Sequence, residues 1–261
     1  MDDTDLGTNP PIVPARFPAC RICPFLRRDE PDVCWGCCAR RFPTPSPRCC
    51  PVCEQPLPTG QVCGNDWCSR ADRWFSLTWS LGPHGGAWRE TIAAYKYRGE
   101  LGWAEVFGRV LVGFLDEHMP WFDHYDHLLP MPAFTGTGAR RSWDPVGRVV
   151  AAASCLAGPR WPFSAGLVSK RFETPPLTGQ PRSARRACAE GPLRRSLVVV
   201  DPAAIDGCRL LVIDDVFTEG STLREVARAL LLAGAEEVAG LTLARQPWRA
   251  SRPRPPRPRP A

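Results

Sequence analysis

Apolar residues recur along the chain from Trp74 onward with the two spacings that mark helices and strands. The helical spacing predicts helices over residues 86–96, 103–117 and 146–157, and a further helix from Leu223. Short apolar runs predict strands over residues 127–129, 197–200, 209–213 and 238–244. The last two strands and the helix between them span about 35 residues, a length typical of a βαβ unit with parallel strands. We therefore predict an α/β fold with a parallel sheet for this part of the chain.

The segments on either side of this part have a different composition. Ten of the 13 Cys lie between Cys20 and Cys68, in a segment with few aliphatic residues and repeated Pro. Such a segment cannot bury enough apolar surface to fold unaided. The predicted parts are a disordered N-terminus, a small Cys-rich module, an α/β domain and a disordered Pro/Arg-rich tail, at residues 1–19, 20–70, 74–245 and 246–261 respectively.

The net charge of +6 is concentrated in the tail. Five Arg and no acidic residue lie in residues 246–261, so the rest of the chain is almost neutral and shows no basic nucleic-acid-binding face. No run of 18 apolar residues is present, and the first twenty residues lack an apolar segment. We therefore expect no transmembrane helix, no membrane insertion and no signal peptide, and a cytoplasmic location in which thiols stay reduced.

The Cys-rich module contains four pairs of closely spaced thiols. In a reducing compartment, such pairs are typical of metal ligands rather than of disulfides. Two pairs close a tetrahedron of thiolates, which suits zinc, so eight Cys predict two structural zinc sites. The predicted ligands, paired in chain order, are Cys20, Cys23, Cys34 and Cys37 for one site and Cys50, Cys53, Cys63 and Cys68 for the other.

Several alternatives to this assignment stay open. Cys38 can replace Cys37, and Cys49 can replace Cys50, although the knuckle-like sequence Cys50-Pro51-Val52-Cys53 favours Cys50. A cross-braced pairing of the eight thiols is an alternative to pairing in chain order. A redox-active or partly vestigial Cys cluster is the alternative to zinc.

The strongest motif lies where the apolar strand 209–213 ends. Asp214 and Asp215 come directly after it, followed by a small polar loop and the start of a helix. Ligands of open α/β sheets bind at the carboxyl ends of the strands, and free N–H groups of a loop and helix start favour a phosphate. Two adjacent carboxylates suit sugar hydroxyls and Mg²⁺. The motif therefore predicts a site for a phosphorylated sugar. The purely structural alternative is a solvated Asp-Asp turn and a capping box formed by Thr222 and Glu225.

The sequence Asp-Asp-Val-x-Thr-x-Gly-x-Thr of this motif resembles the diphosphoribosyl-binding signature of type I phosphoribosyltransferases. Four further segments narrow the resemblance to the ComF/GntX-like branch, in which a double zinc ribbon precedes the transferase domain. They are Lys96-Tyr97-Arg98-Gly99, Pro130-Met131-Pro132, Arg141-Ser142-Trp143-Asp144-Pro145 and the element at residues 177–185. The resemblance covers roughly residues 20–245, and the order of the five segments is more specific than any one of them.

The resemblance implies a Mg²⁺-dependent phosphoribosyltransferase that binds phosphoribosyl diphosphate and transfers its phosphoribosyl group to an unknown acceptor. Asp214 and Asp215 would hold the ribose hydroxyls, and Arg141 would neutralise the leaving pyrophosphate. The 5′-phosphate would be held by the loop that consists of Phe217, Thr218, Glu219, Gly220, Ser221 and Thr222. The resemblance also suggests a link to DNA uptake (competence) or to carbon metabolism, with single-stranded nucleic acid or DNA-processing proteins as partners.

The chain departs from the family pattern at several positions. Glu219 stands where the signature usually has Thr, Arg185 stands where the later element has Asn, and the 141–145 element keeps only its Arg and an aromatic residue. A carboxylate beside a bound phosphate repels it unless the side chain points to solvent. The second hypothesis is therefore a catalytically degenerate scaffold that binds nucleotide or nucleic acid with its zinc module and basic tail. A third is a scaffold that docks through the Pro/Arg tail.

Overall fold

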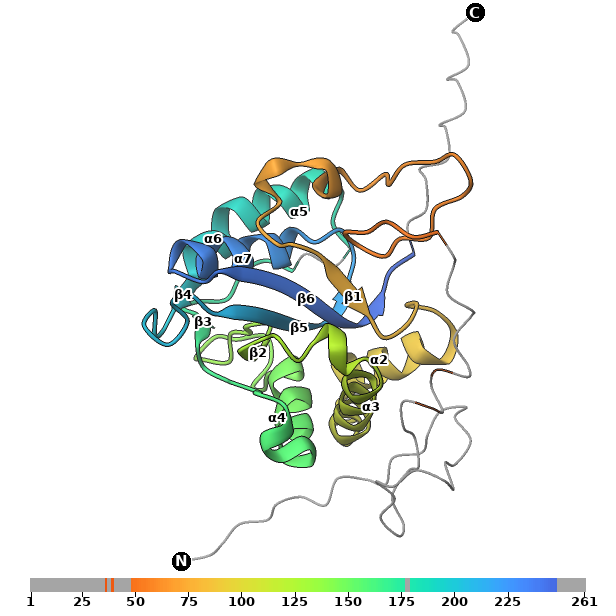
Figure 1. Ribbon diagram of the computed structural model, residues 1–261. Helices are drawn as coiled ribbons and strands as arrows, with labels where there is room; N and C mark the ends of the chain where they lie inside the picture. The colour runs from red at the N-terminus through yellow and green to blue at the C-terminus, as the bar shows by residue number, and fades with distance from the viewer. Residues whose placement is uncertain (1–35, 37–38, 40–47, 177–178, 248–261) are drawn as a thin grey trace, which may run out of the picture.

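Four parallel strands form the central sheet of the computed structural model, which describes residues 36, 39, 48–176 and 179–247 (Figure 1). The strand order is β1-β6-β5-β2. These strands comprise Thr78–Ser80 (β1), Glu237–Arg245 (β6), Arg209–Phe217 (β5) and His127–Pro130 (β2). The two long strands β5 and β6 are buried along most of their length, as expected for the middle of a parallel sheet.

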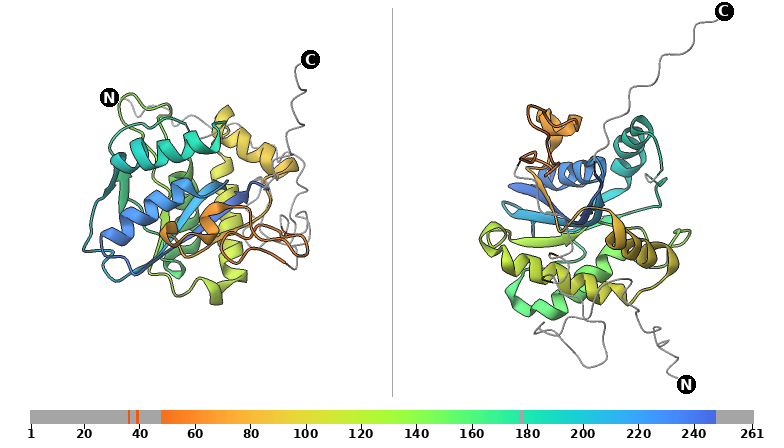
Figure 2. Two further views of the ribbon diagram at one scale, coloured as in Figure 1. Left: turned by 90° about the horizontal axis from the view of Figure 1, so that it is seen from above. Right: turned by 90° about the vertical axis from the view of Figure 1, so that its right-hand side faces the viewer.

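Helices cover both faces of this sheet (Figure 2). One face carries α2 (Gly86–Arg98), α3 (Trp103–Glu117) and α4 (Pro145–Ala157). Gly108 brings α3 and α4 into close contact, because a Cβ atom at this position would lie 2.8 Å from the backbone nitrogen of Ala153. The other face carries α7 (Ser221–Leu232), with α5 (Arg182–Cys188) and α6 (Arg194–Ser196) beside it.

A second, two-stranded sheet lies outside the central one. Its strands β3 (Val168–Lys170) and β4 (Leu197–Val199) are antiparallel. The segment between them forms α5, a π-helical turn (Ala189–Leu193) and α6. Together these elements form a lobe, of which β3 and α5 reach the carboxyl ends of the central strands.

Residues 48–73 contain only two short 3₁₀ helices, η1 (Asp66–Ser69) and η2 (Ala71–Arg73). This segment contacts the edge strand β1 through specific hydrogen bonds. Thr78 N donates to Val52 O at 2.8 Å, and Ser80 N donates to the Glu54 carboxylate at 2.7 Å. Further 3₁₀ turns follow α3 (Met119–Trp121, η3) and α4 (Gly158–Arg160, η4).

The predicted α/β fold with a parallel sheet is confirmed, and so are the three helices at 86–96, 103–117 and 146–157, to within two residues at each end. Two boundaries were wrong. Strand β5 does not end at Ile213 but continues to Phe217, and α7 begins at Ser221 rather than at Leu223. The strand predicted at 197–200 exists as β4, but it pairs with β3 outside the central sheet.

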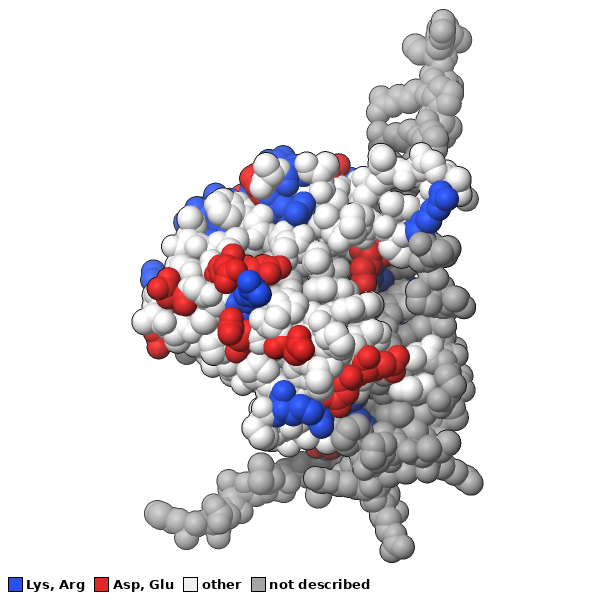
Figure 3. All heavy atoms as spheres, in the orientation of Figure 1, with Lys and Arg blue, Asp and Glu red and all other residues white. Residues whose placement is uncertain are grey.

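Charged side chains of both signs are mixed on the face shown in Figure 3, which agrees with the near-neutral charge of the chain outside its tail. Among the residues that the structure describes, no helix has the length and apolar character needed to cross a membrane.

Candidate ligand cleft and thiolate cluster

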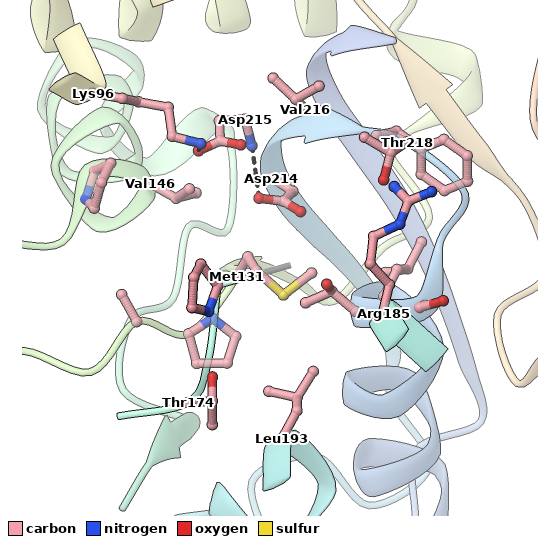
Figure 4. A pocket seen from close by; sticks show the side chains of 18 of the residues that line it. Lys96, Met131, Val146, Thr174, Arg185, Leu193, Asp214, Asp215, Val216 and Thr218 are labelled. Atoms are coloured by element: carbon pink, nitrogen blue, oxygen red, sulfur yellow. Dashed lines mark hydrogen bonds and ion pairs between the residues drawn. The ribbon is translucent and has the colours of Figure 1, made fainter. Parts of the chain in front are cut away.

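A cleft of about 820 Å³ lies at the carboxyl ends of the central strands (Figure 4). All four strands of the sheet lead into it. Strand β5 contributes its last four residues, and the segments after β1, β2 and β6 contribute His84, Met131 and Gln246, respectively. The opposite wall comes from the lobe of β3 and α5, with Lys170 and Arg185. The cleft therefore occupies the place where open α/β sheets bind ligands.

Asp214 and Asp215 lie in β5 itself and not in a loop after it, which corrects the predicted strand end. Both line the cleft, and in Figure 4 the Asp214 carboxylate lies between Met131 and Thr218. Asp215 Oδ2 lies 2.6 Å from Lys96 Nζ of α2, and its own backbone N–H donates to Asp214 Oδ1 at 2.8 Å. The pair is therefore held in place by a cation from the neighbouring helix and by its own backbone.

The electrostatics of this pair follow from its burial. Desolvation, and then the neighbouring Asp215 carboxylate, raise the pKa of Asp214 to about 7. Burial opposes the charge of Lys96, but the ion pair with Asp215 prevails and raises the pKa of this amine. Burial lowers the pKa of Lys170, with partial compensation from Asp214. Asp214 thus ionises near neutral pH, and hydroxyl donors or a cation would favour its charged form.

The loop between β5 and α7 turns at Gly220, whose φ of +96° is left-handed. A Cβ atom here would lie 3.0 Å from the Phe217 ring and 3.2 Å from the Phe75 ring, so the turn requires glycine for two reasons. The backbone of the loop is then directed into α7 with no side-chain cap at Gly220. The first N–H groups of the helix are therefore available to an anion.

The capping box predicted as the structural alternative is not formed. Thr222 is the second residue of α7 rather than the residue before the helix. The Glu225 carboxylate is buried and pairs with Arg194 at 2.8 Å and with Arg224. Glu225 therefore fixes α7 against α6 and does not reach back to the helix start.

Glu219 of the same loop is 2% exposed, so its carboxylate does not point to solvent. Ser221 Oγ donates to Glu219 Oε1 at 2.8 Å, and Arg185 Nη2 lies 3.4 Å from Glu219 Oε2. Arg182 lies at 3.8 Å from the same oxygen. The sequence left two possibilities for this carboxylate, namely exposure to solvent or repulsion of a bound phosphate. The structure shows a third, because the carboxylate is buried and paired with arginines of α5.

The remaining predicted site residues take different positions. Thr218 is exposed at the cleft and Phe217 is buried beneath the loop. Arg141 lines the cleft, with its guanidinium group 5.2 Å from the centre of the Tyr97 ring. The structure thus brings Asp214, Asp215, Arg141 and the 217–222 loop to one cleft.

Four of the eight predicted metal ligands form a cluster. The Sγ atoms of Cys50, Cys53, Cys63 and Cys68 all lie within 4.8 Å of one another, and no disulfide joins them. The Sγ atom of Cys63 lies 3.6 Å from that of Cys53 and 3.7 Å from that of Cys68. A tetrahedral zinc with Zn–S bonds of about 2.3 Å requires S···S distances of about 3.8 Å, so this donor set fits zinc.

Cys49 is exposed and is not part of the cluster. Cys20, Cys23, Cys34 and Cys37 lie outside the described residues, as does Cys38. Arg245, the last residue of β6, donates to Cys53 Sγ at 3.3 Å and to Cys53 O. A buried guanidinium beside four thiolates offsets the negative charge that such a cluster keeps when it holds one divalent ion.

Four residues at the site were not predicted as site residues from the sequence. Lys96 was identified only as part of a motif, and the scarcity of Lys, which sets Lys96 and Lys170 apart, was assigned no function. They are the two Lys in a chain that otherwise uses Arg, and both line the cleft, so the rare retention of Lys was a usable signal. Asn65 and Trp67, which contact the 217–222 loop from the Cys-rich segment, gave no sequence signal.

No protein-family model and no curated protein matches the chain. Solved structures similar to it include a hypoxanthine phosphoribosyltransferase from Staphylococcus aureus (9% identity, TM-score 0.33), covering 55% of this chain and 65% of that one. A purine phosphoribosyltransferase from Pyrococcus horikoshii has 20% identity and a TM-score of 0.29, with 55% of this chain and 73% of that one covered. A hypoxanthine phosphoribosyl transferase from Trypanosoma cruzi has 9% identity and a TM-score of 0.32, with coverage of 60% and 75%.

The match spans less than two thirds of the Staphylococcus aureus enzyme. Similarity at this level does not establish what the present chain binds. The fold and the site themselves define an α/β protein with a carboxylate-lined ligand cleft at the ends of its parallel strands and a four-thiolate cluster beside it.

Proposed function

We propose that this protein is a Mg²⁺-dependent phosphoribosyltransferase of the ComF/GntX-like kind, which binds phosphoribosyl diphosphate in the cleft. One observation carries the proposal: Asp214 and Asp215 share the cleft with the uncapped start of α7, and Lys96 anchors Asp215. A phosphorylated sugar needs hydroxyl acceptors and phosphate donors in this combination. The link to DNA uptake rests on the sequence resemblance alone.

In this proposal, Asp214 and Asp215 accept hydrogen bonds from the ribose hydroxyls, and the N–H groups of the 217–222 loop hold the 5′-phosphate. Lys96 orients Asp215 through the ion pair between them. The bond between ribose C1 and pyrophosphate breaks with its electron pair leaving on pyrophosphate, and a bond forms between C1 and the acceptor nucleophile. The two carboxylates then face a ribose that gains positive charge in the transition state, which they stabilise.

Arg141 is the candidate to neutralise the pyrophosphate, since it lines the same cleft from the loop before α4. Asp214 and Asp215 would hold Mg²⁺, and the ion would supply charge neutralisation on the leaving group. The carboxylate oxygens at this position are the donor type that Mg²⁺ prefers, so the residues fit the ion. The thiolate cluster has all four positions occupied by protein ligands, which suits a structural metal and not a catalytic one.

The pairing of Glu219 with Arg185 and Ser221 favours a second candidate function. It occupies a hydroxyl and a guanidinium that would otherwise face a phosphate. The same scaffold would then be catalytically degenerate and would bind nucleotide or single-stranded nucleic acid, with contacts from the zinc module and the basic tail.

Calorimetric titration with phosphoribosyl diphosphate and Mg²⁺ separates these candidates. We expect the wild type to bind with a roughly micromolar Kd, and Asp215→Asn to abolish binding. Asp123→Asn, which removes an exposed carboxylate that does not line the cleft, is the matched control and should bind like the wild type. No binding by the wild type but binding by Glu219→Thr would favour the degenerate scaffold. No binding by any variant would overturn the proposal.

The nucleic-acid candidate has its own test. Single-strand binding that persists after deletion of residues 246–261 would exclude the tail as its only source. A salt dependence that disappears with the tail would instead assign the binding to the five Arg of that segment.

A further inference from the structure

Two buried side chains join the thiolate cluster to the candidate phosphate loop. Asn65 Nδ2 donates to Glu219 O at 2.9 Å, and Trp67 Nε1 donates to Ser221 Oγ at 3.3 Å. Asn65 is 2% exposed and Trp67 is 1% exposed. Both lie in the short segment between the predicted metal ligands Cys63 and Cys68. Each of these two side chains therefore connects the cluster segment directly to the loop through one hydrogen bond.

The segment between the two ligands is itself tightly held. Asn65 Oδ1 accepts from Trp67 N at 3.3 Å, and Cys68 N donates to Asn65 O at 3.0 Å. One side of the Asn65 amide therefore fixes the turn that carries Cys68, while the other side reaches the loop. A displacement of Cys68 would therefore move Asn65, which is the donor of the hydrogen bond to the loop.

Trp67 stands at a junction of three segments. Its ring lies 4.4 Å from the guanidinium carbon of Arg224 in α7 and 4.8 Å from that of Arg186 in α5. Arg70 lies against the same ring at 4.8 Å. The indole is thus fixed against the first turns of α7, and its N–H reaches Ser221 at the helix start.

The hydrogen bond to Glu219 O has a direct consequence for the loop. The C=O and N–H groups of a trans peptide point in opposite directions. When Asn65 holds the Glu219 carbonyl, it therefore also fixes the direction of the Gly220 N–H. Among the described residues, no acceptor is hydrogen-bonded to this N–H. Gly220 lines the cleft and Asn65 does not, so the carbonyl faces the Cys-rich segment while the opposite side of the peptide remains for a ligand.

We propose that Asn65 and Trp67 are positioning residues for the phosphate loop, and that the thiolate cluster, by holding them, couples metal occupancy to binding of the sugar phosphate. The identity of the ligand rests on the proposed function. The coupling itself rests on the two hydrogen bonds and on the position of their donors between two thiolates. Loss of metal is expected to release residues 63–68 and to loosen the 217–222 loop.

The test compares two Trp→Phe variants. Trp67→Phe keeps an aromatic ring beside the three guanidinium groups and removes the N–H to Ser221 together with part of the indole, a loss of volume that the control below shares. Trp161→Phe is the matched control, because Trp161 is also buried and donates its indole N–H to Asp116 at 2.8 Å, in a part of the fold outside the cleft. Zinc content and thermal stability are measured first, to show that both variants are folded and loaded.

Amide exchange by mass spectrometry then measures the loop without any ligand. We expect exchange in residues 217–222 to rise about tenfold in Trp67→Phe and to stay unchanged in Trp161→Phe, with the strand at 127–130 protected in both. Affinity for phosphoribosyl diphosphate with Mg²⁺ should fall roughly tenfold in Trp67→Phe only. Equal exchange and equal affinity in the two variants would overturn the inference.

Chelation of the wild type gives a second measurement. The inference expects exchange in the 217–222 loop to rise while residues 127–130 stay protected, and an unchanged loop after metal loss would overturn it. If chelation unfolds the whole chain, amide exchange of the metal-loaded Trp67→Phe and Trp161→Phe variants tests the inference instead. If the wild type binds no phosphoribosyl diphosphate, the proposed function fails, whereas the exchange data still confirm or reject the coupling of cluster and loop.

Discussion

Arg185 and Glu219 contact each other across the cleft, with 3.4 Å between Arg185 Nη2 and Glu219 Oε2. Both stand at positions where the chain departs from the family pattern that its sequence resembles. They come from α5 and from the β5–α7 loop, 34 residues apart in the chain. The two residues therefore form one pair, in which an arginine of α5 balances the buried carboxylate of the 217–222 loop.

The first prediction concerns the stability of this pair. Glu219 is nearly inaccessible to water, so Arg185→Ala should destabilise the fold by about 2–3 kcal/mol, because it leaves a buried carboxylate with weaker compensation. The double variant Arg185→Ala/Glu219→Gln should recover most of this loss, since no charge then remains unpaired. Denaturant unfolding of the four species measures the coupling.

The matched control is Arg140→Ala, which breaks the surface pair with Glu173. That change should cost less than about 1 kcal/mol, because the Arg140 and Glu173 side chains are 51% and 30% exposed and solvent screens their pair. A loss for Arg185→Ala no larger than for Arg140→Ala would show that the buried pair contributes nothing to stability.

The second prediction concerns pH. The folded-state pKa of Asp214 is raised from 3.8 to about 7 by burial and by Asp215, so the fold favours the protonated acid. The stability contributed by this proton is fully present below pH 3.8 and is lost as the pH rises through 7. Asp214→Asn should therefore be more stable than the wild type by about 2 kcal/mol at pH 8, with a difference that shrinks as the pH falls toward 4.

Urea unfolding of both proteins across this pH range measures the difference. The variant should at the same time lose phosphoribosyl diphosphate binding, because the amide is a poorer acceptor for ribose hydroxyls. Asp214 would then be a residue that is retained for function at a cost in stability. A pH-independent difference between the two proteins would mean that Asp214 does not titrate in this range.

The sequence was sufficient to predict the fold class and the position of the cleft, but not the wall that closes it. The pattern at residues 209–213 indicated a strand end because two carboxylates follow. In the structure, Asp214 pairs with Thr242 and Phe217 pairs with Arg245, so pairing with β6 extends the strand past its polar residues. Such an extension depends on a partner strand, and local periodicity carries no information about it.

Contacts between distant segments were also beyond local patterns. Asn65 and Glu219 are 154 residues apart, and the Cys-rich segment was expected to be a separate module. The spacing of its thiols predicted ligands but gave no indication that the residues between them reach the cleft. The Lys96–Asp215 pair was recoverable in part, since Lys96 is one of only two Lys in the chain.

The third prediction concerns the metal. Elemental analysis should find about two zinc atoms per chain if both sets of four thiols bind, as their spacing predicts. Cys50→Ser should lose one of them and destabilise the Cys-rich segment by several kcal/mol, because ligand binding and folding of such a segment are coupled. Cys49→Ser, at the adjacent exposed position, should keep both zinc atoms. The opposite result, with loss for Cys49→Ser and retention for Cys50→Ser, would show that the neighbouring thiol is the ligand.

The fourth prediction concerns the turn of the 217–222 loop. Gly220 combines a φ of +96° with the rings of Phe217 and Phe75 at 3.0–3.2 Å from the position of a Cβ atom. Gly220→Ala therefore suffers both backbone strain and a clash. We expect the free energy of unfolding to fall by about 2–4 kcal/mol and phosphoribosyl diphosphate binding to be lost.

Gly207→Ala is the matched control, because Gly207 has a φ of +69° and nothing within 4 Å of its Cβ position. It should cost only about 1 kcal/mol and leave binding intact. Both positions have a left-handed φ, but +96° lies further from the αL region than +69°, so the difference in thermal unfolding measures the additional backbone strain and the ring clash together. Equal losses of stability and normal binding in Gly220→Ala would mean that the Phe217 and Phe75 rings yield without moving the loop, and that the start of α7 does not need this turn to bind its ligand.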